Sequence, residues 1–365
     1  MSTRPTRDVI AFGERLLALL DQGTFVATYK YAVLLGLIDL CLEKTSRHGV
    51  APESVTTRQL AEKVIELYWP QTVDFRGRTL RQNNGRQARI VSDILSFRDS
   101  LTDPSVILDR ARRQAPLRFE RMVHRVEWTL INMPLPRLQV MGSQTQPLVY
   151  EIGWSVGIER HRASVSQYQQ TGGGSFDNQI RFLPSVGEYL VMLNGLLRPL
   201  IHRAWSGMVA QLNDLDEFRL ERFLFGVDRT QLAAVRPGLV ELQERRCFYC
   251  GDPLPREAEV DHFIPWARYP DNGIDNLVVA DKRCNGAKKD FLAAAMHVGN
   301  WRRRNDAGAQ YLADMASSKE WESHPGDTLG VARGLYLRLP ADTRLWIRGP
   351  EFAAADLPRL REILR

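Results

Sequence analysis

Cysteine is scarce in this 365-residue chain, which contains only four. So few cysteines cannot form the dense disulfide framework of small secreted domains. Long apolar runs are also missing, because the longest, Tyr31 to Ile38, stops at Asp39 and is far shorter than the roughly 20 residues of a membrane span. The first eight residues lack the apolar stretch of a secretion signal. We therefore expect a cytoplasmic protein with no membrane partner.

A large excess of charge of either sign is missing as well. Lys and Arg number 49 against 43 Asp and Glu, which gives a net charge of +6 and a pI near 9.2. This excess permits a polyanionic partner but does not establish one. The 44% hydrophobic content excludes collagen-like and wholly disordered classes, and the length favours two or three domains.

The apolar spacing before residue 230 is mostly helical. Leu60, Ala61, Val64, Ile65 and Tyr68 form one stripe, preceded by a capping-box pattern at 56–59. A long helix is predicted over 186–212 with a kink or break at Pro199, and a hairpin is predicted from strands at 138–141 and 148–152.

We predict an α+β fold that is predominantly helical and contains four segments. They are a helical, winged-helix-like or regulatory segment at 1–115, a mostly helical one with a hairpin at 116–235, a small α+β module at 236–300 and an α/β extension at 301–365.

Clustered arginines in the first segment admit two interpretations. Arg76, Arg78, Arg81 and Arg86 occur with no acidic residue between them. They could bind nucleic acid, or they could form a solvated basic face. The same two interpretations apply to Lys289, Arg302 and Arg303 near the third segment.

Three of the four cysteines lie close together in the sequence. Cys247 and Cys250 are separated by two residues, the spacing with which one turn presents two thiolates to zinc, and Cys284 supplies a third. A second pair of this spacing would place its other ligand at Asp281. The fourth ligand could therefore be Asp281, a water or a more distant histidine, unless the site has degenerated and holds no metal.

Further motifs follow in a fixed order around these cysteines. Residues 247–251 read Cys-Phe-Tyr-Cys-Gly, residues 259–265 read Glu-Val-Asp-His-Phe-Ile-Pro, and Asp275-Asn-Leu precedes Cys284-Asn-Gly-Ala-Lys. In this order, residues 245–297 resemble the HNH endonuclease family, a ββα-metal nuclease fold. The resemblance implies two strands and a helix around a catalytic divalent ion.

The local pattern predicts the same elements. Residues 258–263 and 277–280 can form strands, and a helix from about Arg283 would bury Phe291, Leu292, Ala295 and Val298. Beyond them we expect short strands at 335–339 and 345–347 and a final helix from about residue 354.

Phosphodiester hydrolysis requires a base and a cation. His262 has the one unperturbed pKa in the cluster that leaves a side chain substantially neutral at pH 7, so it is the predicted base. Asp261 and Asn285 offer hard oxygen ligands suited to Mg²⁺ or Mn²⁺, and the resemblance assigns them that role. It also implies that Asn276 holds the loop that carries the base. Lys288 or Lys289 could contact the scissile phosphate or stabilise the transition state.

The leading hypothesis is a metal-dependent endonuclease that hydrolyses DNA, with a structural zinc and a role in restriction or phage defence. One alternative is a zinc-containing nucleic-acid-binding protein with a vestigial nuclease centre, and RNA is another candidate substrate. A single centre cuts one strand per encounter, so cleavage of both strands would need a homodimer or two visits.

Overall fold

Two compact units make up the computed structural model, which describes residues 4–22, 27–85, 87–141, 144–145, 147–226 and 231–365. Unit 1 comprises Met1–Cys41 and Pro52–Phe225, and unit 2 comprises Leu42–Ala51 and Gly226–Arg365. Within the described ranges, no helix is both long enough and apolar enough to cross a bilayer. The four predicted segments thus fall into two units, since 1–115 contributes to both and 301–365 joins the module before it.

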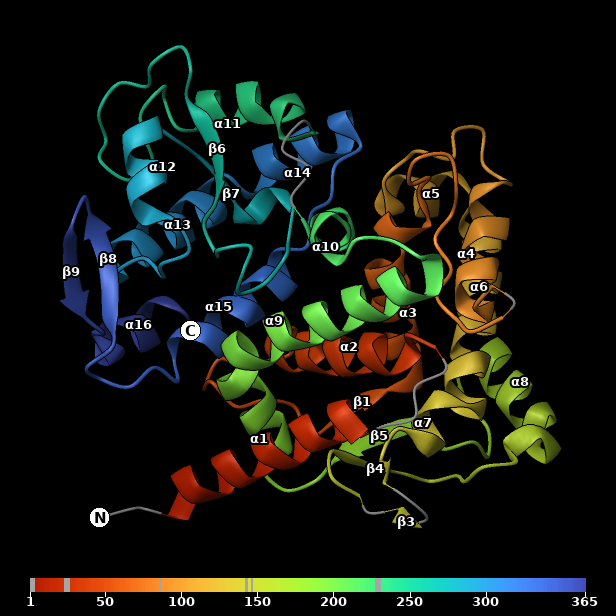
Figure 1. Cartoon of the computed structure of the whole chain (residues 1–365). Helices are drawn as coiled ribbons and strands as arrows, with labels where there is room; N and C mark the ends of the chain where they lie inside the picture. The colour runs from red at the N-terminus through yellow and green to blue at the C-terminus, as the bar shows by residue number, and fades with distance from the viewer. Residues whose placement is uncertain (1–3, 23–26, 86, 142–143, 146, 227–230) are drawn as a thin grey trace. The chain divides into compact units, whose positions relative to one another are not determined.

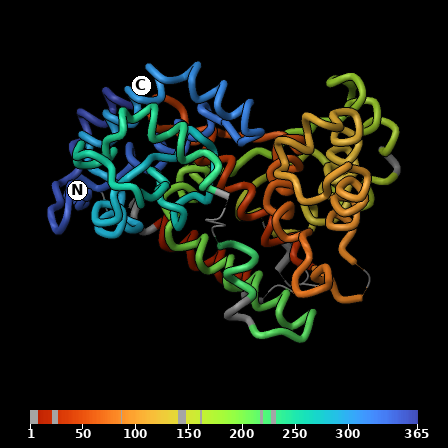
Figure 2. Tube along the Cα trace, turned by 90° about the horizontal axis from the view of Figure 1, so that it is seen from above, coloured from red at the N-terminus to blue at the C-terminus, as the bar shows by residue number. Residues whose placement is uncertain are grey.

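Unit 1 is helical, as predicted, and its path can be followed in Figures 1 and 2. Helix α3 starts at the predicted capping box, in which Thr56 accepts from the Gln59 N–H and the Gln59 side chain accepts from the Thr56 N–H. Helices α3, α4 and α6 pack against one another. The helices are α1 (Arg4–Gln22), α2 (Tyr29–Glu43), α3 (Thr57–Tyr68), α4 (Arg89–Arg98), α5 (Leu108–Gln114), α6 (Pro116–Asn132), α7 (Pro134–Arg137), α8 (Arg162–Thr171), α9 (Val186–Asn213) and α10 (Glu217–Phe225), with 3₁₀ turns η1 (Pro70–Thr72) and η2 (Ile158–His161).

The predicted hairpin in unit 1 is wrong. Strand β4 (Tyr150–Ile152) pairs with β5 (Gln179–Phe182), which also pairs with β1 (Ser54–Thr56), and β2 (Val140–Met141) pairs with β3 (Gln144–Thr145). The Gln139 side chain binds backbone N–H groups at residues 148 and 149, which the predicted hairpin would have paired with the backbone of residues 138–141. Its Oε1 accepts from the N–H groups of Leu148 and Val149 at 2.8 and 2.6 Å.

The long helix α9 is confirmed, with Pro199 inside it. Its apolar stripe of Leu190, Leu197, Ile201 and Trp205 is fully buried. On the same helix Arg198 is buried against Asp39 of α2, with which it forms an ion pair. Apolar packing and this buried pair therefore anchor α9 inside unit 1.

Unit 2 is built around a two-stranded antiparallel sheet of β6 (Glu259–His262) and β7 (Leu277–Ala280), in which His262 faces Leu277. All four residues of β7 are buried, and Leu277 and Val279 join an apolar core with Leu239 and Leu312. The other elements are η3 (Gln231–Ala234), α11 (Arg236–Leu242), η4 (Ile274–Asn276), α12 (Lys282–Lys288), α13 (Ala295–Ala307), α14 (Ala309–Lys319), α15 (Pro325–Tyr336), β8 (Arg344–Arg348), β9 (Glu351–Ala354) and α16 (Leu357–Ile363) (Figure 1).

Two expectations for unit 2 need correction. The helix from Arg283 stops at Lys288 because Lys289 adopts a left-handed φ of +47°, so Phe291 is 46% exposed whereas Val298, in α13, is buried. The strand predicted at 335–339 is instead the end of α15 and the residues after it. The strand at 345–347 and the final helix are confirmed in β8 and α16.

A short early segment, Leu42–Ala51, belongs to unit 2 although the rest of the first 225 residues does not. The Tyr269 hydroxyl donates to the Glu43 carboxylate, and the Arg338 guanidinium donates to the Gly49 carbonyl. Lys44 pairs with Asp327 at 2.8 Å. Unit 2 is therefore assembled from two stretches of chain that lie far apart in the sequence.

Candidate metal centre and active site

The Cys247–Cys250 turn lies against β7. The Phe248 N–H donates to the Val279 carbonyl at 3.0 Å, and the turn closes with Gly251 N–H bound to the Cys247 carbonyl at 2.9 Å. Gly251 has a φ of +75°, a left-handed conformation that glycine adopts without strain. The backbone thus holds both thiols beside the carboxyl end of β7.

Asp281 follows β7 directly and forms the N-cap of α12. Its Oδ1 accepts from the Cys284 N–H at 2.8 Å, while Oδ2 accepts from the Cys250 thiol at 3.3 Å. One carboxylate oxygen therefore caps the helix and the other faces the sulfur atoms. Aspartate is a favoured N-cap residue, so Asp281 can begin α12 and contribute to the cysteine cluster at the same time.

The ligating atoms of Cys247, Cys250, Asp281 and Cys284 lie within 4.8 Å of one another. Zinc–sulfur bonds of ~2.3 Å in a tetrahedral site place sulfur atoms about 3.8 Å apart, so the spacing suits one zinc ion. Among the described residues, this is the single set of three or more Cys, His, Asp or Glu side chains gathered closely enough to hold an ion. Three thiols and a carboxylate fit zinc.

Protonation of this cluster also bears on metal binding. Burial raises the pKa of the Cys250 thiol to about 11 and also raises the pKa of Cys284. Burial opposes ionisation of Asp281 too, but hydrogen bonds from the thiols and from the Cys284 N–H outweigh it and hold the pKa of that carboxyl well below its usual range. A bound cation would displace the thiol protons.

Strand β6 presents two carboxylates to α12. Because side chains alternate along a strand, Glu259 and Asp261 share one face. The Asn285 amide donates to Glu259 Oε2 at 2.6 Å, and Lys288 Nζ lies 3.1 Å from Asp261 Oδ2. These two contacts join β6 to α12 through Asn285 and Lys288, which lie about one turn apart on the helix.

The Asp261 carboxylate is held by two donors at the same oxygen. The Tyr249 hydroxyl donates to Oδ2 at 2.6 Å, beside the Lys288 ammonium. Lys288 is fully buried and also donates to the His262 carbonyl at 2.8 Å. Its ammonium is therefore enclosed in the protein, which differs from the predicted contact between this side chain and a phosphate.

His262 ends β6 and is only 7% exposed. Its Nε2 lies 2.9 Å from Asn272 Oδ1, and its ring contacts Trp266 edge-on at 5.2 Å between centroids. In the tautomer that donates Nε2–H to this amide oxygen, Nδ1 is the basic nitrogen of the neutral ring. Burial lowers the pKa of His262 and keeps the ring neutral.

Asn276 bridges the two ends of the loop that follows His262. Its Oδ1 accepts from the Ile264 N–H at 2.8 Å, and its Nδ2 donates to the carbonyls of Ile264 and Asp271 at 3.2 and 3.1 Å. The side chain is completely buried. Asn276 therefore ties together the two ends of this loop.

The comparison with protein families decides what this arrangement is. The family model described as HNH endonuclease matches residues 247–294. Residues 247–294 form an HNH endonuclease module. The match includes the zinc-type cluster, both strands and α12, and it identifies the segment as a nuclease module. No curated protein and no solved structure matches the chain.

The HNH module brings together some of the predicted residues and not others. Asp261 and Asn285 lie at the same interface of β6 with α12, but each is bound to a protein partner. Lys289 is exposed at the end of α12. On α13, Arg302 pairs with Asp306 at 3.1 Å and Arg303 donates to Asn300 at 2.6 Å.

Two of the arginines predicted to bind nucleic acid in unit 1 contact the end of α9. Arg78 and Arg81 donate to the carbonyls of Asn213 and Leu212, at 3.0 and 2.6 Å, at the end of α9. Cations there satisfy free carbonyls and complement the helix dipole. Arg76 is exposed, and Arg86 lies outside the described residues.

Three residues of the module were not assigned a role from the sequence. Tyr249 lies inside the Cys-x₂-Cys turn and Asn272 lies in a loop, so neither has a periodic signal. Glu259 did have one, since a carboxylate two residues before Asp261 on a strand shares its face. Tyr249 and Asn272 become visible only once the turn and the loop are folded.

Proposed function

We propose that this protein is a metal-dependent HNH endonuclease that hydrolyses phosphodiester bonds in DNA. The observation that carries the proposal is the contact of His262 Nε2 with Asn272 Oδ1 at 2.9 Å in an HNH module, which orients the ring so that Nδ1 serves as the base. A base that is buried, neutral and oriented is suited to deprotonating an attacking water.

In this mechanism His262 Nδ1 takes a proton from water as the water oxygen attacks phosphorus, the P–O bond to the leaving sugar oxygen breaks, and that oxygen takes a proton from solvent. Asn272 stabilises the imidazolium through Nε2–H, and Asn276 keeps the intervening loop in place. Positioned general bases contribute about 10²- to 10⁴-fold to a rate.

Asp261 and Asn285 are the proposed ligands of Mg²⁺ or Mn²⁺. The donor set fits such an ion, because both donors at Asp261 approach Oδ2, so Oδ1 remains to face a cation. Asn285 likewise uses its Nδ2 on Glu259 and keeps its carbonyl oxygen. A bound divalent ion supplies charge neutralisation at the phosphate and the leaving oxygen. Few protein ligands suffice, since Mg²⁺ is often held by one or two carboxylates and substrate phosphates.

A zinc ion at Cys247, Cys250, Cys284 and Asp281 has the proposed task of stabilising the module. The two-stranded sheet and the 7-residue helix α12 are small, and structural zinc contributes folding free energy to such units. The ion would also fix the turn that carries Tyr249, which is bound to Asp261.

The biological context is proposed from the architecture. An HNH module joined to a larger helical unit suits a restriction or phage-defence nuclease in the cytoplasm, in which unit 1 supplies recognition or regulation. Cleavage of both strands would use a homodimer or two encounters. These proposals concern the whole chain, whereas the family match concerns residues 247–294.

The experiment is a cleavage assay with supercoiled plasmid, labelled duplex DNA, single-stranded DNA and RNA, with Mg²⁺ or Mn²⁺. We expect DNA nicking that His262→Ala reduces by at least about 10²-fold, because the base is removed. His48→Ala is the matched control, since His48 is exposed in unit 2 outside the module.

Three results would contradict the proposal. Cleavage by the His262→Ala variant at the wild-type rate would contradict the assignment of His262 as the general base. Cleavage of RNA but not of DNA would contradict DNA as the substrate. Binding without cleavage under either metal would favour a nucleic-acid-binding protein with an inactive centre.

A further inference from the structure

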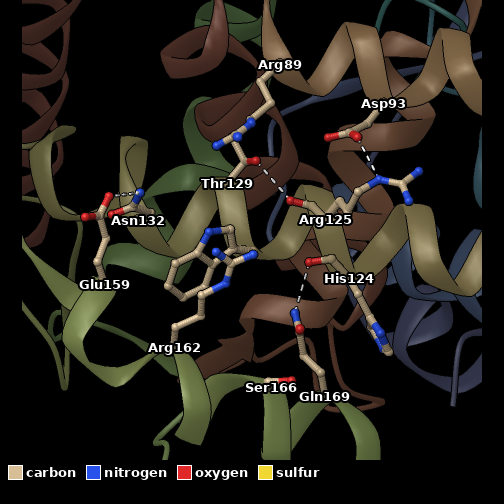
Figure 3. A pocket seen from close by; sticks show the side chains of 11 residues that line it. Arg89, Asp93, His124, Arg125, Thr129, Asn132, Glu159, Arg162, Ser166 and Gln169 are labelled. Atoms are coloured by element: carbon tan, nitrogen blue, oxygen red, sulfur yellow. Dashed lines mark hydrogen bonds and ion pairs between the residues drawn. The ribbon is translucent and has the colours of Figure 1, made fainter.

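A cavity of about 620 Å³ lies in unit 1 and belongs to none of the elements of the HNH module. Residues of α4, α6, η2 and α8 line it (Figure 3). Pockets of ~300–1,000 Å³ accommodate small organic ligands. The volume is therefore sufficient for a molecule of nucleotide size.

Three arginines reach this cavity from three helices. Arg125 of α6 is bound to Asp93 of α4 at 2.7 Å, which fixes its guanidinium. Arg89 at the start of α4 and Arg162 at the start of α8 have no carboxylate partner within the described ranges, and Figure 3 shows both side chains extending into the space between the helices. Two guanidinium groups that form no ion pair with another described residue thus face one cavity.

An aromatic surface lies beside one of them. The Arg162 guanidinium carbon is 5.5 Å from the ring centroid of Trp128, a distance typical of a cation–π contact. Trp128 packs against the buried cluster of Ile131, Ile158 and Val165. Its indole is therefore held in place at the wall of the cavity, next to the Arg162 guanidinium.

A carboxylate and an amide lie on the wall as well. Glu159 of η2 accepts from the Asn132 amide at 3.3 Å through Oε1, and its carboxylate lines the cavity. Guanidinium groups bind phosphate in paired hydrogen bonds, an aromatic–guanidinium platform stacks a base, and a carboxylate accepts from ribose hydroxyls. Fatty acids and simple inorganic anions would use only part of this set.

From these four features we infer that the cavity binds a nucleoside phosphate, with its phosphate at Arg89 and Arg162, its base against Trp128 and its sugar or amino groups at Glu159. The ligand can be a free nucleotide or the phosphorylated end of a nucleic-acid strand, because both present the same chemistry. The inference does not rest on the proposed nuclease activity, since all its residues lie in unit 1.

The experiment is calorimetric titration of the full-length chain with AMP, ATP, a 5′-phosphorylated deoxyoligonucleotide, its unphosphorylated counterpart and inorganic phosphate, without added divalent metal. We expect saturable binding of at least one nucleoside phosphate. Arg89→Ala and Arg162→Ala should each weaken it about ten-fold or more, because each removes charge-assisted hydrogen bonds.

Arg121→Ala is the matched control, since Arg121 is exposed on the same helix as Arg125 and does not line the cavity. His262→Ala should also bind normally, which separates this site from the nuclease centre. Binding of mononucleotides identifies a free nucleotide as the source, and binding of the 5′-phosphorylated oligonucleotide alone identifies a strand end.

Three results would overturn the inference. They are an absence of saturable binding for all the probes, equal affinity for inorganic phosphate and nucleotides, and unchanged affinity in both arginine variants. Thermal unfolding of each variant without ligand shows whether it is folded, so loss of binding in a folded variant is attributable to the lost guanidinium.

Discussion

At the scale of single residues, Tyr249 links the cysteine cluster of the module to Asp261. It lies between the paired thiols, yet its hydroxyl binds the carboxylate proposed to hold the catalytic ion, at 2.6 Å. The ring is buried and contacts Phe248 and Trp346 edge-on, so its position is determined by packing. Zinc-dependent order in the turn would therefore be transmitted to Asp261.

Replacing Tyr249 with Phe removes this hydrogen bond and leaves the ring. We expect Mn²⁺ binding at the catalytic site to weaken about ten-fold, because a hydrogen bond to a charged group is worth roughly 1.5–3 kcal/mol. Raising the metal concentration should restore most of the cleavage rate. Electron paramagnetic resonance of free Mn²⁺ measures the affinity, with zinc content as the check on the turn.

Tyr311→Phe is the control for this variant. The Tyr311 hydroxyl also binds a carboxylate, that of Glu241 at 3.0 Å, but it lies on α14 at the surface. The proposed positioning role of Tyr249 would be contradicted by wild-type Mn²⁺ affinity in Tyr249→Phe. A loss of zinc with no separate effect on Mn²⁺ would contradict it too.

Lys288 and Lys289 are neighbours with opposite surroundings, since Lys288 is fully buried against Asp261 and Lys289 is exposed. Lys288→Met should lower the free energy of unfolding by about 3–5 kcal/mol, because it leaves a largely buried carboxylate without its cation. Lys289→Ala should change stability by less than about 0.5 kcal/mol. Chemical denaturation measures both.

The exposed lysine is the better candidate for a phosphate contact. Lys289→Ala should reduce the salt dependence of DNA binding by about one unit in the log–log slope, as expected for one lost phosphate contact. Equal stability of the two variants would mean that the ion pair of Lys288 contributes nothing to the fold.

At the scale of elements, the order of motifs predicted β6, β7 and the start of α12, and the spacing of the cysteines made Asp281 one of several candidates for the fourth position of the cluster. Alternation along β6 was also readable. The end of α12 was not, because it depends on the left-handed backbone of Lys289, a residue that sequence periodicity does not mark for this conformation. Nor was the pairing of β4 with β5, which follows from long-range contacts and from the Gln139 side chain.

Asp281 combines two tasks at the start of α12, and a single substitution separates them. Asp281→Asn keeps a side-chain acceptor for the Cys284 N–H, so the helix cap should persist. It removes the anionic ligand, and we expect zinc affinity to fall at least about ten-fold. Competition with a chelator, read by zinc content, measures the change.

Two further variants complete this test. Asp281→Cys should retain zinc, because a fourth thiolate replaces the carboxylate. Asp252→Asn is the control, since Asp252 is exposed and is 3.8 Å from Arg283 at the surface. Unchanged zinc affinity in Asp281→Asn would assign the fourth position to a water or to another residue.

At the scale of the whole molecule, the sequence predicted the class of fold but not the division of the chain. Leu42–Ala51 joins unit 2 through residues without a local signal, including the contact of Glu43 with Tyr269. Periodicity describes neighbours along the chain, whereas this association links positions more than 220 residues apart. The 42–51 segment is therefore a part of unit 2 that only the folded chain reveals.

Gly330 in α15 marks where this segment packs. A Cβ atom added there would lie 1.8 Å from the Glu43 carbonyl oxygen, whereas one added at Gly326 of the same helix meets nothing within 4 Å. The obstacle at Gly330 is backbone, so side-chain rotation cannot relieve it. The two glycines provide a matched pair within one helix.

Gly330→Ala should therefore lower the free energy of unfolding by about 3 kcal/mol or more, at the upper end of overpacking costs, since α15 and the 42–51 segment must separate. Gly326→Ala should raise it by roughly 0.4–1 kcal/mol, because alanine reduces the freedom of the unfolded chain at an open helical position. Chemical denaturation gives the two values, and hydrogen exchange should show faster amide exchange at residues 42–51 in the first variant alone. If both variants are equally stable and protect residues 42–51 alike, this segment does not pack on α15 and unit 2 is formed by residues 226–365 without it.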